Sequence, residues 1–312
     1  MALRPNSPAA RDVANQLHPY TNARLHEKNG PVIIEKGKGV YVYDDQGKEY
    51  IEGLAGLWSV AVGFGEPRLA KAAAAQMDKL PYYHSFAHKA HNPSIDLAEK
   101  LNQMVPIDGG KVFFANSGSE ANDTVMKLVW FYNNALGRPE KKKFISRIKG
   151  YHGITIASGS LTGLPYNHMD FDLPIKNVLH TACPHHYRFA EAGESEVEFA
   201  SRLAGQLEQQ ILDEGPETIA AFIGEPVMGA GGVIVPPATY WDKIQKVCRK
   251  YDILVVADEV ICGFGRTGQL FGSNTYDIQP DILVMSKQMS SSYMPISAFV
   301  FSDAIYQVVA DN

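Results

Sequence analysis

The chain has 312 residues, 45% of them hydrophobic and 20% charged, and carries a formal net charge of −5. This size supports one large folded domain or one and a half, and the acidic balance without a long basic run excludes an electrostatic nucleic-acid binder. The three cysteines are far apart in the sequence and do not form a disulfide framework, and the chain contains neither the apolar core of a signal peptide nor an apolar run long enough to span a membrane. We therefore expect a cytoplasmic protein whose partners are small molecules and other proteins.

The first part of the chain predicts an arm and a β-hairpin. Polar residues run to about Asn29, and alternating runs at 40–43 and 48–51 flank the turn residues 44–47. Two such runs across a short turn that contains glycine are typical of a hairpin. We assign residues 1–60 to this arm and hairpin and regard them as part of a small domain.

The remaining residues, 61–312, are assigned to a large domain that begins with two helices. Proline at the opening position predicts one helix over 66–79, and Ser94 as cap predicts a second to about Met104. Beyond them, apolar runs of strand length alternate with helical segments, which predicts βαβ units and an α/β fold with a mainly parallel seven-stranded sheet flanked by helices. The expected strands lie within 112–116, 143–148, 177–182, 219–227, 253–260, 282–287 and 296–302.

The strand expected at 282–287 ends in a lysine, Lys287. An amine at the carboxyl end of a parallel strand lies where open α/β sheets bind ligands. If it is partly withdrawn from water, its pKa falls and it can attack carbonyl carbons. Taken alone, Lys287 fits better a side chain that extends its charged end from a strand into solvent.

Residues 116–122 lie between an expected strand and an expected helix. Ser117 and Glu120 have the spacing of a capping box, which would explain them without any ligand. A strand, a glycine turn and a helix N-terminus also make an anion site, because free backbone N–H groups and the helix dipole converge there. Gly118 would let the backbone approach a phosphate and Ser119 would add a hydroxyl, so a cap and a phosphate site both remain open.

A second buried strand ends in two carboxylates, Asp258 and Glu259. The pattern also resembles the magnesium-holding strand of nucleotide hydrolases, but the chain has no G-x-x-x-x-G-K-[ST] loop. A carboxylate on the same rim as Lys287 and the 117–120 turn could instead hold a protonated heterocyclic nitrogen. A phosphate anchor, a lysine amine and an acidic partner for a pyridinium are the three contacts that pyridoxal 5'-phosphate requires.

Five short motifs follow one another in a characteristic order. They are 116–122, Tyr151-His-Gly153, Gly224-Glu-Pro226, Asp258-Glu-Val260 followed by 263–268, and Ser286-Lys287. In order and spacing they resemble the class III aminotransferases of the fold-type I pyridoxal phosphate enzymes, and the resemblance runs from about residue 15 to the end of the chain.

The resemblance implies a role for each matching residue. Lys287 would be the catalytic lysine that forms a Schiff base with the cofactor, and Asp258 would be the partner of the pyridine nitrogen. Tyr151 would stack on one face of the ring and Val260 would press on the other. Gly118 and Ser119 would bind the phosphate, and Glu225 is a further residue of the family's site motif.

Within the class, residues 53–59 and 18–22 look like the omega-transaminases, or amine–pyruvate aminotransferases. In that group a small residue and aromatic residues, one of them from the neighbouring subunit, line the substrate pockets. The matching residues here are Tyr20, Trp58, Phe86 and Ala230, with Tyr151 also expected at the substrate. Without the resemblance, such aromatic residues would be read as core.

Two other patterns are set aside. Residues 263–268 satisfy G-x-G-x-x-G but do not lead into a helix, so they are not a dinucleotide fingerprint. Two groups of possible metal ligands lack the paired spacing of a zinc site, so no metal is expected. These groups are His84, His88 and His91, and Cys183, His185 and His186.

The resemblance implies a homodimer with shared active sites that moves an amino group from a primary amine or omega-amino acid to a keto acid such as pyruvate. The reaction would run through Lys287 in a ping-pong cycle. Family members continue beyond Ser302 into a C-terminal domain, most of which we expect this chain to lack. Two alternatives stay open: a truncated, non-catalytic cofactor-binding remnant or assembly partner, and a class III transaminase that uses 2-oxoglutarate.

Overall fold

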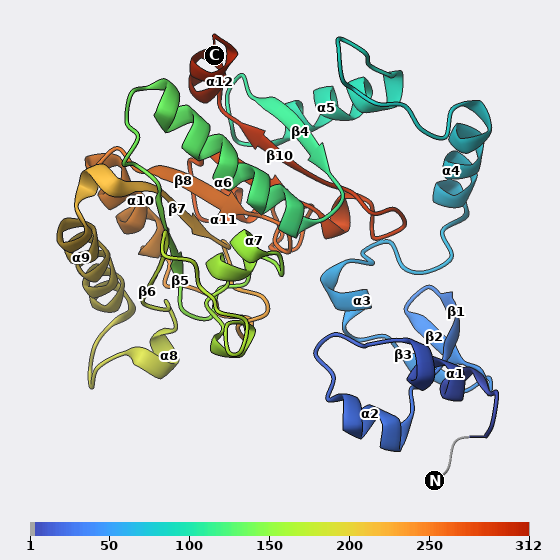
Figure 1. Cartoon of the computed structure of the whole chain (residues 1–312). Helices are drawn as coiled ribbons and strands as arrows, with labels where there is room; N and C mark the ends of the chain where they lie inside the picture. Colours follow the sequence, from blue (N-terminus) through green and yellow to red (C-terminus); the bar gives the residue numbers. More distant parts are fainter. Residues whose placement is uncertain (1–3, 312) are drawn as a thin grey trace. The chain divides into compact units, whose positions relative to one another are not determined.

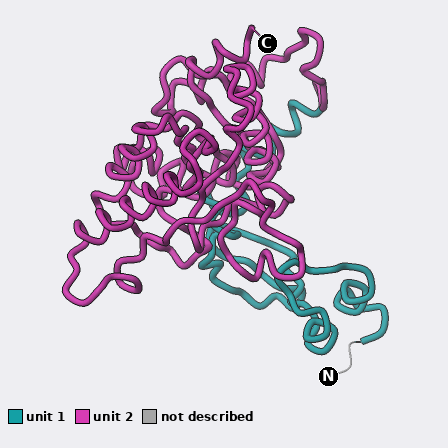
Figure 2. The backbone as a smooth tube through the Cα atoms, turned by 60° about the vertical axis from the view of Figure 1, so that its left-hand side comes forward, with its two compact units in different colours: residues 1–78 teal, residues 79–312 magenta. Residues whose placement is uncertain are grey.

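The structure is a computed structural model that describes residues 4–311 (Figure 1). It divides into two compact units, residues 1–78 and 79–312 (Figure 2). The domain boundary expected at residue 60 lies inside the first unit. Gly39 and Phe64 exchange backbone hydrogen bonds of 2.9 and 2.8 Å, which tie the segment after the hairpin to that unit.

The first unit contains a three-stranded antiparallel sheet in the order β1-β2-β3. The expected hairpin is confirmed as β2 and β3, and the buried Asp44 fixes its turn by accepting hydrogen bonds from Lys48 N (2.9 Å) and Tyr50 Oη (2.8 Å). β1 was not predicted, because the sequence of this exposed strand does not alternate between apolar and polar residues. The elements are α1 (Pro8–Asn15), α2 (Ala23–Asn29), β1 (Ile34–Lys38), β2 (Tyr41–Asp44), β3 (Glu49–Ile51), α3 (Ala55–Trp58) and α4 (Pro67–Lys79).

The second unit is built on a seven-stranded sheet in the order β4-β10-β9-β8-β7-β5-β6. The pairs from β9 to β6 are parallel, whereas β10 runs antiparallel to both β4 and β9. The expected mainly parallel sheet is therefore confirmed. Its strands are β4 (Lys111–Ala115), β5 (Lys143–Arg147), β6 (Val178–Thr181), β7 (Ile219–Gly224), β8 (Leu254–Asp258), β9 (Ile282–Met285) and β10 (Ser297–Phe301).

Helices cover both faces of this sheet (Figure 1). In β9, Ile282 and Val284 pack in the core beneath α6, whereas Leu283 and Met285 pack on the opposite face, where α5 contributes Leu101. Burying one side chain of this size contributes about 1.5–3 kcal/mol. One face carries α6 (Gly118–Ala135), α7 (Ile156–Leu161) and α12 (Asp303–Ala310), and the other carries α5 (Asn92–Met104), α9 (Glu196–Glu214) and α10 (Tyr240–Lys250).

The helix expected over 66–79 is confirmed as α4, whereas the helix expected from a Ser94 cap, α5, begins earlier. This helix starts at Asn92 rather than at Ser94, because the ring of His91 caps it and accepts a 3.3 Å hydrogen bond from Ser94 N. The short elements α8 (His186–Phe189), α11 (Gly272–Thr275), η1 (Pro165–Asn167), η2 (Pro216–Thr218) and η3 (Lys287–Met289) complete the second unit. Between residues 4 and 311, no helix has both the length and the apolar composition that spanning a membrane requires.

Candidate active site

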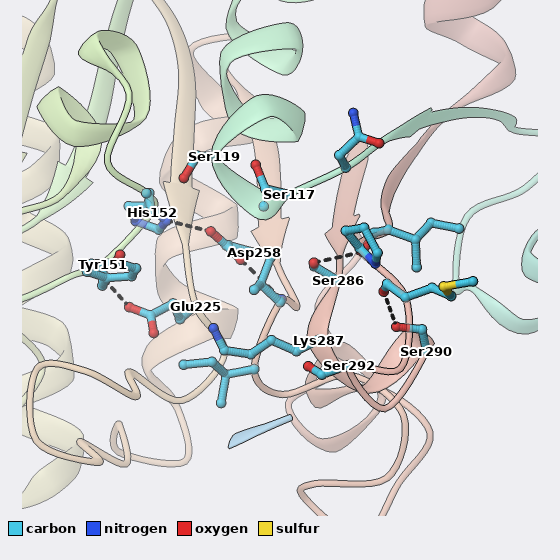
Figure 3. A pocket seen from close by; sticks show the side chains of 18 residues that line it. Ser117, Ser119, Tyr151, His152, Glu225, Asp258, Ser286, Lys287, Ser290 and Ser292 are labelled. Carbon is cyan, nitrogen blue, oxygen red and sulfur yellow. Dashed lines mark hydrogen bonds and ion pairs between the residues drawn. The ribbon is translucent and has the colours of Figure 1, made fainter. Parts of the chain in front are cut away.

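The carboxyl ends of the parallel strands border one cavity of about 440 Å³ (Figure 3). Asp258 is the last residue of β8, Glu225 follows β7 directly, and Lys287 follows β9 by two positions. Ligands of open α/β sheets bind at this edge. All residues predicted to bind the cofactor line the cavity: Gly118, Ser119, Tyr151, Glu225, Asp258, Val260 and Lys287.

Asp258 is held in one orientation by three donors. His152 Nδ1 lies 2.7 Å and Asn122 Nδ2 3.0 Å from Asp258 Oδ2, while Val260 N donates to Oδ1 at 3.1 Å. The side chains of Asp258 and His152 are only 3% and 0% exposed. An ionised carboxylate only accepts hydrogen bonds, so this one suits a protonated ring nitrogen.

Lys287 begins the short turn η3 with a backbone φ of +42°. Such left-handed backbone costs a residue with a side chain roughly 1–2 kcal/mol and is found at functional sites, where the surrounding structure fixes it. Burial lowers the pKa of the Lys287 amine, and the charges of Asp258 and Glu225 oppose this shift. A lowered pKa leaves more of the amine uncharged near neutral pH, which is the form that attacks a carbonyl.

The turn at the start of α6 is both a helix cap and a close-packed cradle. Ser117 Oγ accepts a 3.2 Å hydrogen bond from Glu120 N, as in a capping box. In the standard box the glutamate would accept in return from the N–H of Ser117, but here Glu120 Oε2 accepts from the N–H of the preceding residue, Asn116, at 2.8 Å. A Cβ added at Gly118 would lie 3.1 Å from a methyl group of Val260. Ser119 Oγ accepts from Ile154 N at 3.1 Å, and Gly118 and Ser119, the first two residues of the helix, line the cavity.

Glu225 links two loops beside the cavity. One carboxylate oxygen accepts from Tyr151 N at 3.0 Å and the other from Gly229 N at 2.8 Å. Burial raises the pKa of this carboxyl group. Glu225 therefore positions the backbone of Tyr151 and the turn that carries Ala230, rather than standing free as an acid.

Glu259 points away from this cavity and serves the loop that leads to α11. Its carboxylate accepts from Gly272 N at 3.0 Å and from Ser273 N and Oγ at 2.5 and 2.7 Å. Burial raises the pKa of Glu259 to about 6. Adjacent residues of a strand face opposite sides, so the two carboxylates at the end of β8 have separate tasks.

His152 and Asn122 are site residues to which the sequence assigned no role. Asn122 Nδ2 bridges Asp258 and the backbone carbonyl of His152, the latter at 2.7 Å. Both residues belong to motifs that the sequence does show, 116–122 and Tyr151-His-Gly153. A histidine next to Tyr151, the residue predicted to stack on the ring, was the available signal, but its partner 106 positions away became evident only in the folded chain.

Of the second-unit residues predicted at the substrate, Tyr151 lines this cavity, whereas Phe86 and Ala230 do not. In the second unit, Ala230 follows Gly229 in a turn and Phe86 is 79% exposed, and neither lines the cavity. Tyr20, 69% exposed, and the partly buried Trp58 belong to the first unit. Substrate contacts of these four residues therefore stay predictions.

The donor set of the cavity fits pyridoxal phosphate. A lysine with a lowered pKa, a fixed buried carboxylate and a helix N-terminus line one space, while Gly118 leaves room that a side chain would fill. These are the anchor, amine and acidic partner that the cofactor needs.

Comparison with known proteins agrees with this geometry. The profile of the family "Aminotransferase class-III" matches residues 23–312. "Gamma-aminobutyrate transaminase 1, mitochondrial" of Oryza sativa subsp. indica is 58% identical over 294 residues, which are 94% of this chain and 57% of the relative. The corresponding protein of Solanum lycopersicum is 58% identical over 296 residues, covering 95% and 58%. The chain thus spans somewhat more than half the length of these curated relatives.

Solved structures give the same family. The omega transaminase from Pseudomonas jessenii in complex with PMP is 69% identical with a TM-score of 0.97, over 98% of this chain and 68% of that chain. A structure described as "Transaminase with L-ala" is 64% identical with a TM-score of 0.95, over 99% and 70%.

The expected cytoplasmic location is wrong in the light of these comparisons. The curated relatives are named mitochondrial, and a further one from Solanum lycopersicum, 55% identical, is named chloroplastic. Organelle-targeting segments are amphipathic and lack the apolar core of a secretory signal. A search for such a core therefore did not distinguish the cytosol from an organelle.

The predicted family, fold class and cofactor are confirmed together. The family match covers most of the chain, the similar structures share the whole second-unit sheet, and a relative contains the aminated form of pyridoxal phosphate. This chain belongs to the class III aminotransferases, enzymes of the fold-type I group that use pyridoxal phosphate.

Proposed function

We propose that the protein moves an amino group from a primary amine or omega-amino acid to a keto acid such as pyruvate. The observation that carries this proposal is the convergence of Lys287, Asp258 and the N-terminus of α6 on one cavity. When bound there, pyridoxal phosphate supplies an electron sink for negative charge that develops on the substrate carbon.

Each side chain of the cavity has a task in this reaction. Lys287 would hold the cofactor through its amine, and the same amine, when free, would move a proton to and from the substrate carbon as general base and acid. Asp258, fixed by His152, would face the ring nitrogen and favour its protonated form. Tyr151 and Val260 would contact the ring, and the turn at Gly118 and Ser119 would bind the phosphate.

Pyruvate is the acceptor that the comparisons favour. One similar structure was solved with L-alanine, the amino acid that forms when pyruvate accepts an amino group. Among the amine donors, 69% identity to an omega transaminase against 58% to gamma-aminobutyrate transaminases favours a donor of the omega-transaminase type. Donor and acceptor use the same cavity in turn, so the kinetics should be ping-pong.

We further propose that two copies form a homodimer and share their active sites. Phe86 is 79% exposed and Tyr82, four positions earlier in the sequence, is 76% exposed, which leaves aromatic surface for a second subunit. Light scattering after size exclusion would show a mass twice that of the chain, and a monomer at all concentrations would contradict the dimer.

The experiment that tests the reaction is a visible absorption spectrum of the chain with pyridoxal phosphate. Wild-type protein should give the band of lysine-bound cofactor, and Lys287→Ala should not. Lys141→Ala is the matched control, because Lys141 is also a buried lysine with a pKa lowered by burial but lies outside the cavity. The control should keep the band.

Substrates then separate the remaining alternatives. Addition of an amine donor should convert the bound cofactor to its aminated form, and pyruvate should restore the first spectrum. A band that forms and never converts would support a cofactor-binding remnant instead, and recovery with 2-oxoglutarate but not pyruvate would change the acceptor. If folded wild-type protein gives no band that depends on Lys287, the assignment of the site is wrong.

A further inference from the structure

A second group of chemically active side chains lies in the first unit, on the N-terminal arm. Asp12 belongs to α1, His26 belongs to α2, and His18 lies on the segment between these helices. Ser7 caps α1 and Asn22 caps α2, each accepting a hydrogen bond from a backbone N–H of the first turn, so both helices begin at fixed positions. The two helices and their connection bring the three side chains together.

Both histidines direct the same ring nitrogen at one carboxylate. His18 Nε2 lies 3.0 Å from each oxygen of Asp12, and His26 Nε2 lies 2.9 Å from Asp12 Oδ2. The two rings are 4.3 Å apart between centroids, and one ligand atom from each residue lies within 4.8 Å of the others. In the part of the chain that the structure describes, this is the one such group of histidine, cysteine, aspartate or glutamate side chains.

These separations are close to those around a bound ion. Ligand atoms at about 2.0–2.2 Å from a tetrahedral zinc ion lie roughly 3.3–3.5 Å from one another. Each histidine nitrogen therefore needs to move only a few tenths of an ångström away from the Asp12 oxygens for an ion to replace the proton of their hydrogen bond. Each neutral imidazole would then carry its proton on Nδ1.

Access and charge also favour a cation. The three side chains are 13–28% exposed, so they are held by the fold and still reachable from water. A cavity of about 260 Å³ borders both histidines, and its lining includes Glu27 but no lysine or arginine. The carboxylate of Glu27 is paired with Arg24 at 2.7 Å, so the negative charge that remains for a divalent ion is that of Asp12.

We propose that Asp12, His18 and His26 form a binding site for one divalent transition-metal ion of the zinc type. Two imidazoles and one carboxylate are the ligands such ions prefer, and a site with three protein ligands leaves further positions for water. The spacing of the residues in sequence does not follow a known zinc motif, and no metal was expected from it. All three ligands belong to the first unit, and the inference does not depend on the proposed aminotransferase reaction.

Titration of Zn²⁺ into the full chain by calorimetry tests this inference. Wild-type protein should bind one ion per chain, and Asp12→Asn, His18→Ala and His26→Ala should each weaken binding by more than roughly tenfold, since even loss of an outer partner costs that much. His88→Ala is the matched control: this exposed histidine lies outside the cluster and should leave binding unchanged. The three cysteines are buried and should not compete.

His26→Gln separates metal binding from folding. The amide still donates a hydrogen bond to Asp12 but is a poor metal ligand, so this variant should unfold at the wild-type temperature in chelator and lose Zn²⁺ binding. Co²⁺ offers a second readout through a visible ligand-field band that chelator removes. The inference is overturned if neither ion binds, or if the cluster variants bind Zn²⁺ as the wild type and the His88 variant do.

Discussion

Two aspartates of this protein accept hydrogen bonds from histidine, and they differ mainly in burial. Asp258 and His152 lie 2.7 Å apart with side chains 3% and 0% exposed. Asp12 and His26 lie 2.9 Å apart with side chains 15% and 13% exposed, and His18 adds a third group at 3.0 Å. The same chemical pair therefore occurs once inside the main cavity and once near the surface.

The difference in burial gives the two pairs different capacities. Inside the protein the low dielectric strengthens a hydrogen bond and makes an unpaired partner costly, so Asp258 has one stable arrangement. Near the surface, water can replace either partner, so the hydrogen bonds between Asp12 and the two histidines can break and re-form. A buried pair suits a charge that must stay in place during catalysis, and a partly exposed pair suits an ion that must enter and leave.

The largest effect is expected when the buried pair loses its charge. Asp258→Asn keeps the shape of the side chain, but the first half-reaction should slow on the order of a hundredfold or more, because fixed charge at a reacting centre is typically worth this much. Rapid mixing of cofactor-loaded protein with an amine donor measures the rate. The exposed Asp242, which pairs only with Lys246, is the control: Asp242→Asn should react at the wild-type rate.

Removal of the buried histidine should act on stability. His152→Ala takes away a donor of Asp258 in a place that water does not reach, which should lower the free energy of unfolding by about 1–3 kcal/mol. Urea unfolding followed by circular dichroism measures this quantity. His88→Ala should change it by no more than about 0.5 kcal/mol, as is usual for surface substitutions. Equal losses in the two variants would mean that burial is not the cause.

Burial should also set the pH at which Lys287 reacts. Its pKa is lowered from the ordinary value of 10.5, and the uncharged amine predominates above the lowered pKa. The rate of cofactor capture should therefore rise with pH and level off at a midpoint below 10.5. Stopped-flow absorbance across a pH series measures the midpoint, and a value at or above 10.5 would show that the amine is fully hydrated.

The smallest effect is expected at the exposed pair. The hydrogen bond from His26 lowers the pKa of Asp12 below 3.8, so the stability that this carboxylate contributes is present above pH 3.8 and is lost as pH falls through the lowered pKa. In chelator, Asp12→Asn should unfold at a slightly lower temperature than wild type at neutral pH. The two curves should converge under acid, and a gap that persists there would assign the effect to something other than the charge.

The cofactor side of the site could be predicted because each of its groups follows a strand. Lys287, Asp258 and the turn at Gly118 come directly after apolar runs, and the carboxyl ends of such strands meet at one edge of a sheet. The partners of Asp258 could not be predicted in the same way. His152 and Asn122 reach it across 106 and 136 positions, and no local pattern encodes such a pairing.

Elements whose form depends on their neighbours were also harder to predict. β1 has a polar sequence and is defined by its pairing with β2, and the apolar run of β10 gives no sign that it runs antiparallel. The cluster of Asp12, His18 and His26 depends on the turn between two short helices. Its spacing carried no signal, although each residue is plain in the sequence.

The position of β10 has a consequence for the order in which the site can form during synthesis. This strand lies between β4 and β9, and Ser297 Oγ donates a 2.7 Å hydrogen bond to Ser117 O across 180 positions. A ribosome that adds roughly 5–20 residues per second makes Ser297 roughly 9–36 s after Ser117. During that interval β4 lacks this neighbour, and Phe113 lacks Phe299, on which its ring stacks. The contact that β10 makes with the turn before Gly118 is therefore among the last parts of the site to form during synthesis.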